Sequence, residues 1–290
     1  MTAAGGASGP AGRITTYAHD GLTFDVIDEG PIDGDVVVLL HGFPERASSW
    51  RLVAPLLHAQ GYRTLAPDQR GYSPGARPPR RRDYRFDLLV DDVAALVDTV
   101  GGPVHVVGHD WGANVAWGVA MWHPAKVRSL TAFSVPHPAA YASALKGPQA
   151  LRSWYIAMFN LPRVVETLAA RPGGFFDKSL RRGGMTEADV ARFHEEIVDH
   201  GALPGGLGWY RALPFMRSVP HDQGAHVTVP TTMVWSDGDG FISRVGVERA
   251  GRYVDAPYEL VVLEGVTHWI PEQAPEAAAE AILERLVTTP

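Results

Sequence analysis

A five-residue motif that follows an apolar run constrains this 290-residue chain more than any other segment. The motif is Gly108-His109-Asp110-Trp111-Gly112. A nucleophile between small residues at this spacing predicts a sharp turn from a strand into a helix, because the neighbouring backbone leaves no room for a Cβ atom at either glycine. The central side chain is a carboxylate, which can displace a leaving group at a saturated carbon and form an ester with the protein itself.

The segments around this turn predict strands that alternate with helices. One amphipathic helix is expected over residues 86–100, where apolar side chains recur at helical spacing. Short apolar runs predict strands at residues 23–27, 36–40, 63–67, 104–108, 129–134, 231–236 and 258–263. Continuous apolar runs indicate strands that are covered on both faces. The fold class is therefore α/β, with a mostly parallel sheet and helices on both of its faces.

The alternation of strands and helices fails between residues 136 and 220. This segment is rich in proline, glycine and aromatic residues and has helical stretches such as 146–159. A helical insertion between two strands lies over the carboxyl ends of the sheet, where α/β proteins keep their sites. We therefore expect a helical lid, or cap, at 136–220, inserted in a core formed by 15–135 and 221–290. Residues 1–14 are expected to be a disordered tail, and Pro275 to lie in the first turn of a C-terminal helix that ends at 287.

Composition excludes several classes of function. The net charge of −6 argues against a nucleic-acid partner, whose binding surface would be basic. The absence of cysteine excludes disulfides, thiolate nucleophiles and cysteine-ligated zinc. The sequence has no His-Glu-x-x-His motif, so no metal or other cofactor is expected. No apolar run approaches the roughly 18 residues needed to cross a bilayer, and we expect no membrane partner and a soluble cytoplasmic protein.

Two later loops offer the groups that a carboxylate nucleophile needs for turnover. His268 follows the last predicted strand and can act as the base that activates water. Asp239 follows the preceding strand and can orient that histidine. Asp237 lies in the same loop and is the alternative acid. We favour Asp239 because of its offset from the end of the strand.

The loop after the strand at 36–40 predicts an oxyanion hole. In a strand-to-helix arrangement of this kind, such a loop supplies one backbone N–H group, here that of Phe43, and the residue after the nucleophile, Trp111, supplies the other. The side chains of both residues are also expected to bind substrate. A cis peptide bond before Pro44 is expected, because the chain must reverse sharply there. His41 and His109 are interpreted as structural residues that support these loops.

These motifs resemble those of the α/β-hydrolase superfamily and, within it, the epoxide hydrolases. The similarity covers nearly everything after residue 15, and the order nucleophile, acid, histidine is the order of that superfamily. The motifs are His41-Gly42-Phe43-Pro44-Glu45, Asp68-Gln69-Arg70-Gly71-Tyr72-Ser73, the nucleophile motif, and the loops of Asp239 and His268. The resemblance implies an α/β-hydrolase fold and two lid tyrosines that hydrogen-bond the epoxide oxygen. The matching residues are Tyr155 and Tyr210.

The resemblance implies an epoxide hydrolase, which is a hydrolase acting on ether bonds. Asp110 would attack an epoxide carbon, while Tyr155 and Tyr210 would bind the substrate and act as acids toward the departing oxygen. Water deprotonated by neutral His268 would then hydrolyse the aspartyl ester and release a vicinal diol. The implied partners are a small-molecule epoxide and water. A homodimer is the assembly that we consider.

Two alternative functions stay open. A haloalkane dehalogenase would use the same Asp-His-Asp triad, but it holds a halide through indole or amide donors, often with asparagine where Phe43 stands. A non-catalytic ligand-binding protein of the same fold is the second alternative. Phe43 and the tyrosine pair favour the epoxide hydrolase over the dehalogenase, and an assay for turnover separates either enzyme from a binding protein.

Overall fold

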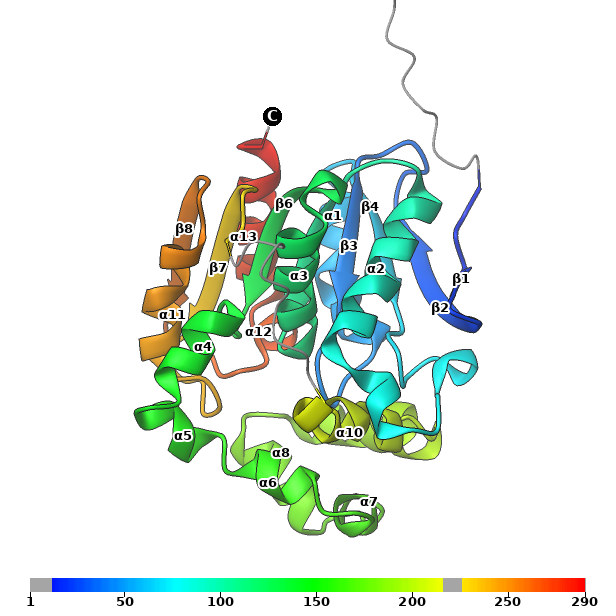
Figure 1. The fold of residues 1–290 in the computed structure, drawn as a ribbon, viewed down its shortest axis with the longest axis vertical. Helices are drawn as coiled ribbons and strands as arrows, with labels where there is room; N and C mark the ends of the chain where they lie inside the picture. Colours follow the sequence, from blue (N-terminus) through cyan, green and yellow to red (C-terminus); the bar gives the residue numbers. More distant parts are fainter. Residues whose placement is uncertain (1–11, 216–225, 290) are drawn as a thin grey trace, which may run out of the picture.

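The computed structural model describes residues 12–215 and 226–289. One eight-stranded sheet crosses the molecule in the order β1-β2-β4-β3-β5-β6-β7-β8 (Figure 1). The pairs β1–β2 and β2–β4 are antiparallel, and the other five neighbouring pairs are parallel, which confirms the predicted α/β class. The strands are β1 (Thr16–His19), β2 (Leu22–Glu29), β3 (Val36–Leu40), β4 (Arg63–Pro67), β5 (Val104–His109), β6 (Val127–Phe133), β7 (Thr231–Ser236) and β8 (Tyr258–Leu263).

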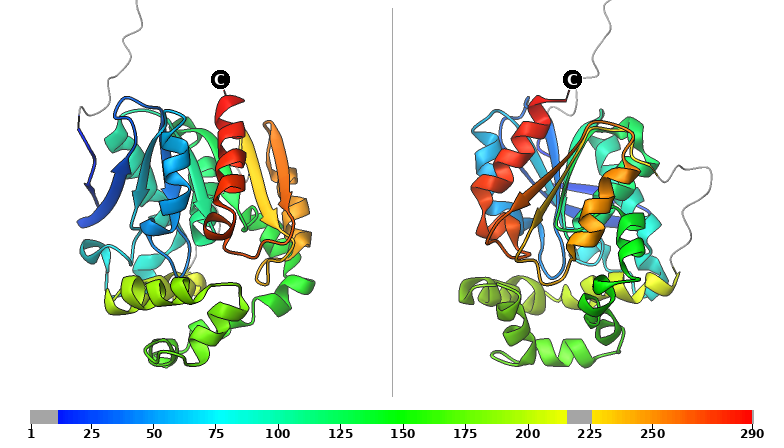
Figure 2. Two further views of the ribbon diagram at one scale, coloured as in Figure 1. Left: turned by 180° about the vertical axis from the view of Figure 1, so that it is seen from behind. Right: turned by 90° about the vertical axis from the view of Figure 1, so that its left-hand side faces the viewer.

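Helices cover both faces of the sheet (Figure 2). One face carries α2 (Phe86–Val100), α3 (Trp111–Trp122) and α11 (Arg244–Ala250), and the other carries α1 (Ala54–His58) and α13 (Pro275–Val287). The short α12 (Ile270–Gln273) precedes α13. The buried side chains form two apolar clusters, one for each face, with Trp117 in the first and Trp50 in the second. The sheet is therefore a packed support that fixes the loops at its ends.

The predicted elements of the core agree closely with the structure. β3, β4, β7, β8 and α2 have the predicted bounds, and α13 begins at Pro275 as expected. β2 begins one residue earlier than predicted and ends two residues later, and β6 is shifted toward the N-terminus. β1 was not predicted, because it has four residues at the sheet edge and only Tyr17 among them is buried. An edge strand of this kind has no continuous apolar run to reveal it.

Seven α-helices and one π-helix lie between β6 and β7 among the described residues. α4 (Pro138–Ala144) packs against α11, and the helices after it gather at one end of the sheet (Figure 1). They are α5 (Pro148–Arg152), α6 (Tyr155–Phe159), α7 (Val164–Ala169), α8 (Phe175–Arg182), α9 (Glu187–Phe193), the π-helix His194–Asp199 and α10 (Leu203–Arg211). The helix predicted at 146–159 is thus two short helices. The boundary predicted at 220/221 lies outside the described residues.

The start of the ordered chain differs from the expectation. Residues 1–11 of the predicted tail lie outside the described residues, but residues 13 and 14 contact the sheet. Ile14 is buried, its N–H donates to Asp28 Oδ2 at 2.6 Å, and Arg13 pairs with the same carboxylate. The prediction of disorder up to residue 14 is therefore wrong for these residues, because a buried aspartate on β2 binds them. Within 12–215 and 226–289, no helix combines the length and apolar content that crossing a bilayer requires.

Candidate active site

Asp110 lies on the turn between β5 and α3, as the motif predicts. Its backbone has φ 52° and ψ −117°, a conformation that residues other than glycine rarely adopt. A Cβ atom at Gly108 would lie 2.2 Å from the carbonyl oxygen of Gly112, and one at Gly112 would lie 2.1 Å from that of Leu40. Both glycines are therefore required by close backbone approach. The turn holds the carboxylate at the carboxyl end of β5, where it lines cavities rather than the apolar core.

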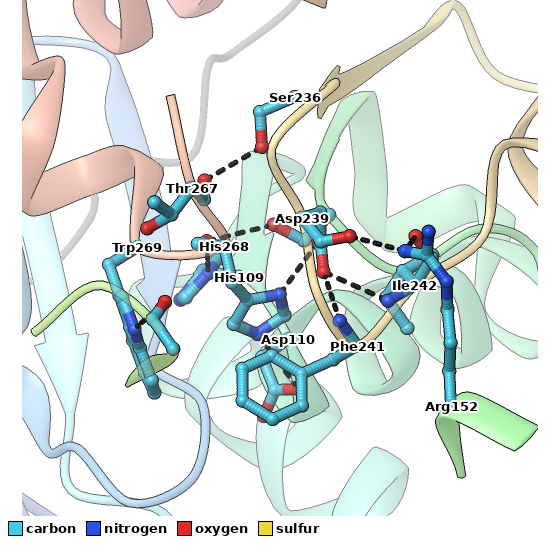
Figure 3. A network of polar contacts seen from close by, with 12 residues as sticks. His109, Asp110, Arg152, Ser236, Asp239, Phe241, Ile242, Thr267, His268 and Trp269 are labelled. Carbon is cyan, nitrogen blue, oxygen red and sulfur yellow. Dashed lines mark hydrogen bonds and ion pairs between the residues drawn. The ribbon is translucent and has the colours of Figure 1, made fainter. Parts of the chain in front are cut away.

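The structure brings His268 between Asp110 and Asp239 (Figure 3). The Nδ1 atom of His268 donates to Asp239 Oδ2 at 2.8 Å, and its Nε2 atom lies 3.4 Å from Asp110 Oδ2. The other carboxylate oxygen of Asp239 accepts the N–H groups of Phe241 and Ile242 at 2.7 and 2.8 Å. Both oxygens of Asp239 are therefore held, so its carboxylate faces the histidine in one orientation.

The alternative acid, Asp237, lies elsewhere in the same loop. Its Oδ1 atom accepts the N–H of Gly265 at 2.8 Å, and its side chain is exposed. Asp239, by contrast, is 2% exposed and contacts the histidine directly. The geometry therefore brings Asp239 and not Asp237 onto His268.

One of the two amide groups expected in the oxyanion hole contacts the nucleophile directly. The N–H of Phe43 donates to Asp110 Oδ1 at 2.9 Å, and the Phe43–Pro44 peptide bond is cis, as predicted. Trp111 is the first residue of α3, so its N–H belongs to the N-terminal amide groups that a helix leaves without an intrahelical partner. Its role as the second donor stays a prediction.

The histidines next to these loops contact backbone, as their structural interpretation predicts. His41 Nε2 accepts the N–H of Gln69 at 3.1 Å, and the ring lies against Tyr72 and Trp209. His109 Nε2 lies 2.8 Å from the carbonyl oxygen of His268. His109 therefore connects the nucleophile turn to the histidine loop through the main chain.

Electrostatics favour a charged resting state for His268 and Asp110. Burial lowers the pKa of His268, but the negative charges of Asp239 and Asp110 override it and raise that pKa to about 10. Burial also raises the pKa of Asp110, but the hydrogen bond and positive charge of His268, with the Phe43 N–H, leave it below its usual value. At neutral pH the site therefore holds an imidazolium beside an ionised Asp110.

The two tyrosines named by the resemblance lie together above Asp110, although 55 residues separate them in the sequence. Tyr155 is in α6 and Tyr210 in α10, with ring centroids 6.1 Å apart and planes at 78°. The Tyr210 ring also meets the Trp111 indole edge-on at 5.0 Å. Burial raises the pKa of both phenols well above the usual value, and the charge of Asp110 raises both further. Both hydroxyls therefore keep their protons at neutral pH.

Two cavities meet at the nucleophile. The first, of about 340 Å³, has His268 in its wall with apolar side chains that include Trp154, Met158, Phe159, Phe176, Leu180, Phe241 and Trp269. The second, of about 470 Å³, is lined by Trp111, Asn114, Tyr141, Leu145 and Leu213, among others. Among the described residues, the residues common to both walls are Asp110, Tyr155 and Tyr210. A bound molecule can therefore extend to both sides of the carboxylate. We call the first the histidine-side cavity and the second the tryptophan-side cavity.

The sequence matches known proteins over most of its length. The alpha/beta hydrolase fold family matches residues 35–275. Epoxide hydrolase A of Mycobacterium tuberculosis is 31% identical over 311 residues, which cover 92% of this chain and 95% of the relative. The AB hydrolase superfamily protein YfhM of Bacillus subtilis is 37% identical over 276 residues, with the same two coverages. The chain belongs to the epoxide hydrolase family of α/β-hydrolases.

Solved structures of this family share the fold described above. Epoxide hydrolase A from Mycobacterium thermoresistibile is similar with a TM-score of 0.81 and 26% identity, over 95% of this chain and 98% of that one. An epoxide hydrolase from Vigna radiata has a TM-score of 0.79 and 31% identity, over 94% and 97% of the two chains. The α/β-hydrolase fold expected from the sequence is therefore confirmed.

Sequence reasoning about this family member missed two polar residues of the segment between β6 and β7. Gln149 and Arg152, on α5, bind the main chain of the loop that carries Asp239. Side-chain contacts to main-chain atoms do not depend on the residue types of the loop, so no motif marks them. The one available signal was a glutamine six residues and an arginine three residues before Tyr155, within an otherwise apolar stretch that includes Leu151 and Trp154.

Proposed function

We propose that this chain opens epoxides to vicinal diols through an ester of Asp110. The observation that carries the proposal is the meeting of two sets of groups at one carboxylate. A histidine paired with an aspartate lies on one side of Asp110, and Tyr155 and Tyr210 line the same cavities with it. A nucleophile, a base and two neutral acids are the groups that hydrolysis of a strained ether requires.

In the first step Asp110 attacks an epoxide carbon and the ring C–O bond breaks. Because Oδ1 already accepts the Phe43 N–H, we assign it as the ester carbonyl oxygen and Oδ2 as the atom that bonds to carbon. The departing oxygen takes a proton from one of the two phenols, Tyr155 or Tyr210, which is left as a phenolate. The other phenol stabilises the developing charge by a hydrogen bond.

Ester formation prepares the second step. Asp110 loses its negative charge, so the pKa of His268 falls, because part of its elevation comes from that charge. The imidazolium proton restores the phenolate to a phenol, and His268 becomes a neutral base. It then takes a proton from water, which adds to the ester carbon while the oxyanion on Oδ1 accepts the Phe43 N–H. Collapse releases the diol, whose oxygen receives the new carboxyl proton, and the ionised Asp110 and imidazolium return.

Oxygen labelling tests this reaction. A single turnover with excess enzyme in ¹⁸O-water should yield an unlabelled diol, because the new diol oxygen comes from Asp110 and the label enters its carboxylate. A second turnover should release labelled diol. Label in the diol of the first turnover would show direct attack by water and would overturn the ester. A haloalkane assayed beside the epoxide separates the dehalogenase alternative, since faster release of halide than of diol would favour that function.

We propose that the helical segment over the sheet binds the substrate. We treat 136–220 as a cap inserted in the core of 15–135 and 221–290, because Tyr155 and Tyr210 come from it while Asp110, Asp239 and His268 follow strands. The apolar walls of both cavities favour substrates with apolar substituents on both epoxide carbons. A panel of terminal and internal epoxides of equal carbon number tests this preference.

The cellular setting is proposed from the sequence. A cytoplasmic location, no membrane or nucleic-acid partner and a small-molecule substrate fit the net charge of −6 and the composition. We propose a homodimer as the assembly, and the molar mass measured by light scattering after size-exclusion chromatography tests it.

A further inference from the structure

Helix α5 contacts the loop that carries the acid. Gln149 is 1% exposed, and both atoms of its amide group have partners in that loop. Its Nε2 atom donates to the carbonyl oxygen of Phe241 at 2.8 Å, and its Oε1 atom accepts the N–H of Ser243 at 2.8 Å. One glutamine from the segment between β6 and β7 therefore satisfies two main-chain groups of the loop after β7.

Arg152, one turn later on the same helix, binds the acid residue itself. Its Nη1 atom donates to the carbonyl oxygens of Asp239 and Ile242, the latter at 2.8 Å (Figure 3). These two carbonyls flank the turn in which the Asp239 carboxylate accepts the N–H groups of Phe241 and Ile242. Arg152 therefore holds the outside of the turn whose inside orients the carboxylate toward His268.

Tyr155, one of the two phenol donors, lies three residues after Arg152 in the sequence. Ser153 Oγ accepts from Gln149 Nε2 at 3.0 Å and lies 2.8 Å from the hydroxyl of Tyr141. Tyr155 follows two residues later, and both Arg152 and Tyr155 line the histidine-side cavity. A stretch of seven residues, 149–155, therefore contains the contacts to the acid loop and one of the two groups proposed to act on the epoxide oxygen.

We propose that Gln149 and Arg152 are positioning residues that fix the Asp239–His268 pair relative to Tyr155. The inference rests on the proposed function. Without these contacts, the acid loop and the segment with Tyr155 would be joined by packing alone, and packing is not directional as hydrogen bonds are. A displacement of about 1 Å at a reacting group can lower a rate by about 10²-fold. Loss of the contacts therefore affects both ester formation, through Tyr155, and ester hydrolysis, through His268.

The test measures the two steps separately in single turnovers, after wild-type protein has been shown to form diol from the same epoxide. Arg152→Met keeps an unbranched stem as far as the ε position and removes the guanidinium donors. We expect both rate constants to fall about 10- to 100-fold, with a smaller change in KM than in kcat. Arg152→Lys retains a donor and should recover part of each rate. Gln149→Met should have an effect in the same direction.

Arg249→Met is the matched control. Arg249 Nη1 also binds across to the segment between β6 and β7, at 3.2 Å from the carbonyl oxygen of Ser143 and 3.0 Å from its Oγ, but it does not contact the acid loop. It should leave both rates within about twofold of wild type. If Arg249→Met slows the reaction as much as Arg152→Met, general loosening of the fold explains the effect and the positioning role is overturned.

A double-mutant cycle with Tyr155→Phe decides between positioning and a merely structural role. If Arg152 acts on ester formation through Tyr155, Arg152→Met should slow that step much less in the Tyr155→Phe background than in wild type. Full additivity, or unchanged rates in Arg152→Met and Arg152→Lys of an active wild type, would overturn the inference. Absence of diol formation by wild type on the whole epoxide panel would instead overturn the proposed function.

Discussion

The two halves of the site hold their side chains by different means. On the sheet side, Asp110, Asp239 and His268 follow strands, and directional contacts fix them, such as the 2.8 Å hydrogen bond between His268 and Asp239. On the opposite side, Tyr155 and Tyr210 come from short helices and meet neighbours mainly through their rings, at 4.9 to 6.1 Å. The charged groups are thus set by hydrogen bonds, whereas the phenols are set mainly by packing, with one side-chain hydrogen bond between Tyr210 and Trp111. Changes on the sheet side should stop a step, whereas changes on the other side should slow one.

The largest effect is expected at the nucleophile. Asp110→Ala should lower turnover by at least about 10⁴-fold, because no other described group is placed to form the ester. The fold should survive, since alanine is smaller. Diol formation and circular dichroism measure the two outcomes. Activity within tenfold of wild type, in a sample free of other hydrolases, would remove the ester from the mechanism.

Loss of the base should block the second step and leave the first step intact. His268→Gln should still form the ester, because attack on the epoxide needs no base, but release should slow by about 10³-fold. Intact-protein mass spectrometry should then show an adduct of the mass of the substrate. Asp110→Ala is the control that must show no adduct. A spectrum of unmodified His268→Gln after long incubation would contradict the assignment.

Removal of the tyrosine hydroxyls should slow the first step, and the effect should grow with the number of donors lost. Tyr155→Phe and Tyr210→Phe should each lower the rate of ester formation by about 10²-fold, because each removes one donor to the departing oxygen. The double variant should be nearly inactive on epoxides. Hydrolysis of an ester that has already formed should change little, which single-turnover measurements can resolve. Unchanged ring opening in the double variant would break the distinction between the two halves.

The smallest change concerns protonation. The pKa of His268, about 10 in the protein, should fall by roughly 1–3 units in Asp110→Asn, because one of the charges that attract the imidazolium is removed. NMR titration of the imidazole measures the midpoint in both proteins. An unchanged midpoint would assign the whole elevation to Asp239. In that case, ester formation would not prepare His268 as a base.

The same shift has a consequence for stability. Because the pKa of His268 in the folded protein lies above the usual histidine value of 6.5, its charge stabilises the protein fully below pH 6.5, and this contribution is lost as the pH rises to about 10. The free energy of unfolding should therefore fall over this range more steeply in wild type than in Asp110→Asn. Chemical denaturation at several pH values measures the difference. Equal slopes in the two proteins would contradict the coupling.

The sheet side could be predicted from sequence and the opposite side only in part. Buried parallel strands have continuous apolar runs, so β3, β4, β7 and β8 were found with their bounds. The glycines of the nucleophile turn are required by backbone contact, so that motif is local. The helix predicted at 146–159 was wrong as a single element, because its pattern does not show the break between α5 and α6.

The candidate site divides along the same line. Asp110, His268 and Asp239 follow from spacing and loop position, and the structure brings them together. Tyr155 and Tyr210 came from the resemblance, since their approach depends on how separate helices pack. Gln149 and Arg152 were missed, because their partners are main-chain atoms far away in the sequence.

The unequal cavities on the two sides of Asp110 have a consequence for handedness. An internal epoxide with two different substituents can enter with either one in the histidine-side cavity of about 340 Å³ and the other in the tryptophan-side cavity of about 470 Å³. The two orientations present different ring carbons to a carboxylate that attacks from one fixed direction. If the proposed reaction holds, we therefore expect the fit of the two ends to select the ring carbon that is attacked, so that the configuration of the diol would be decided at a distance from the bond that breaks.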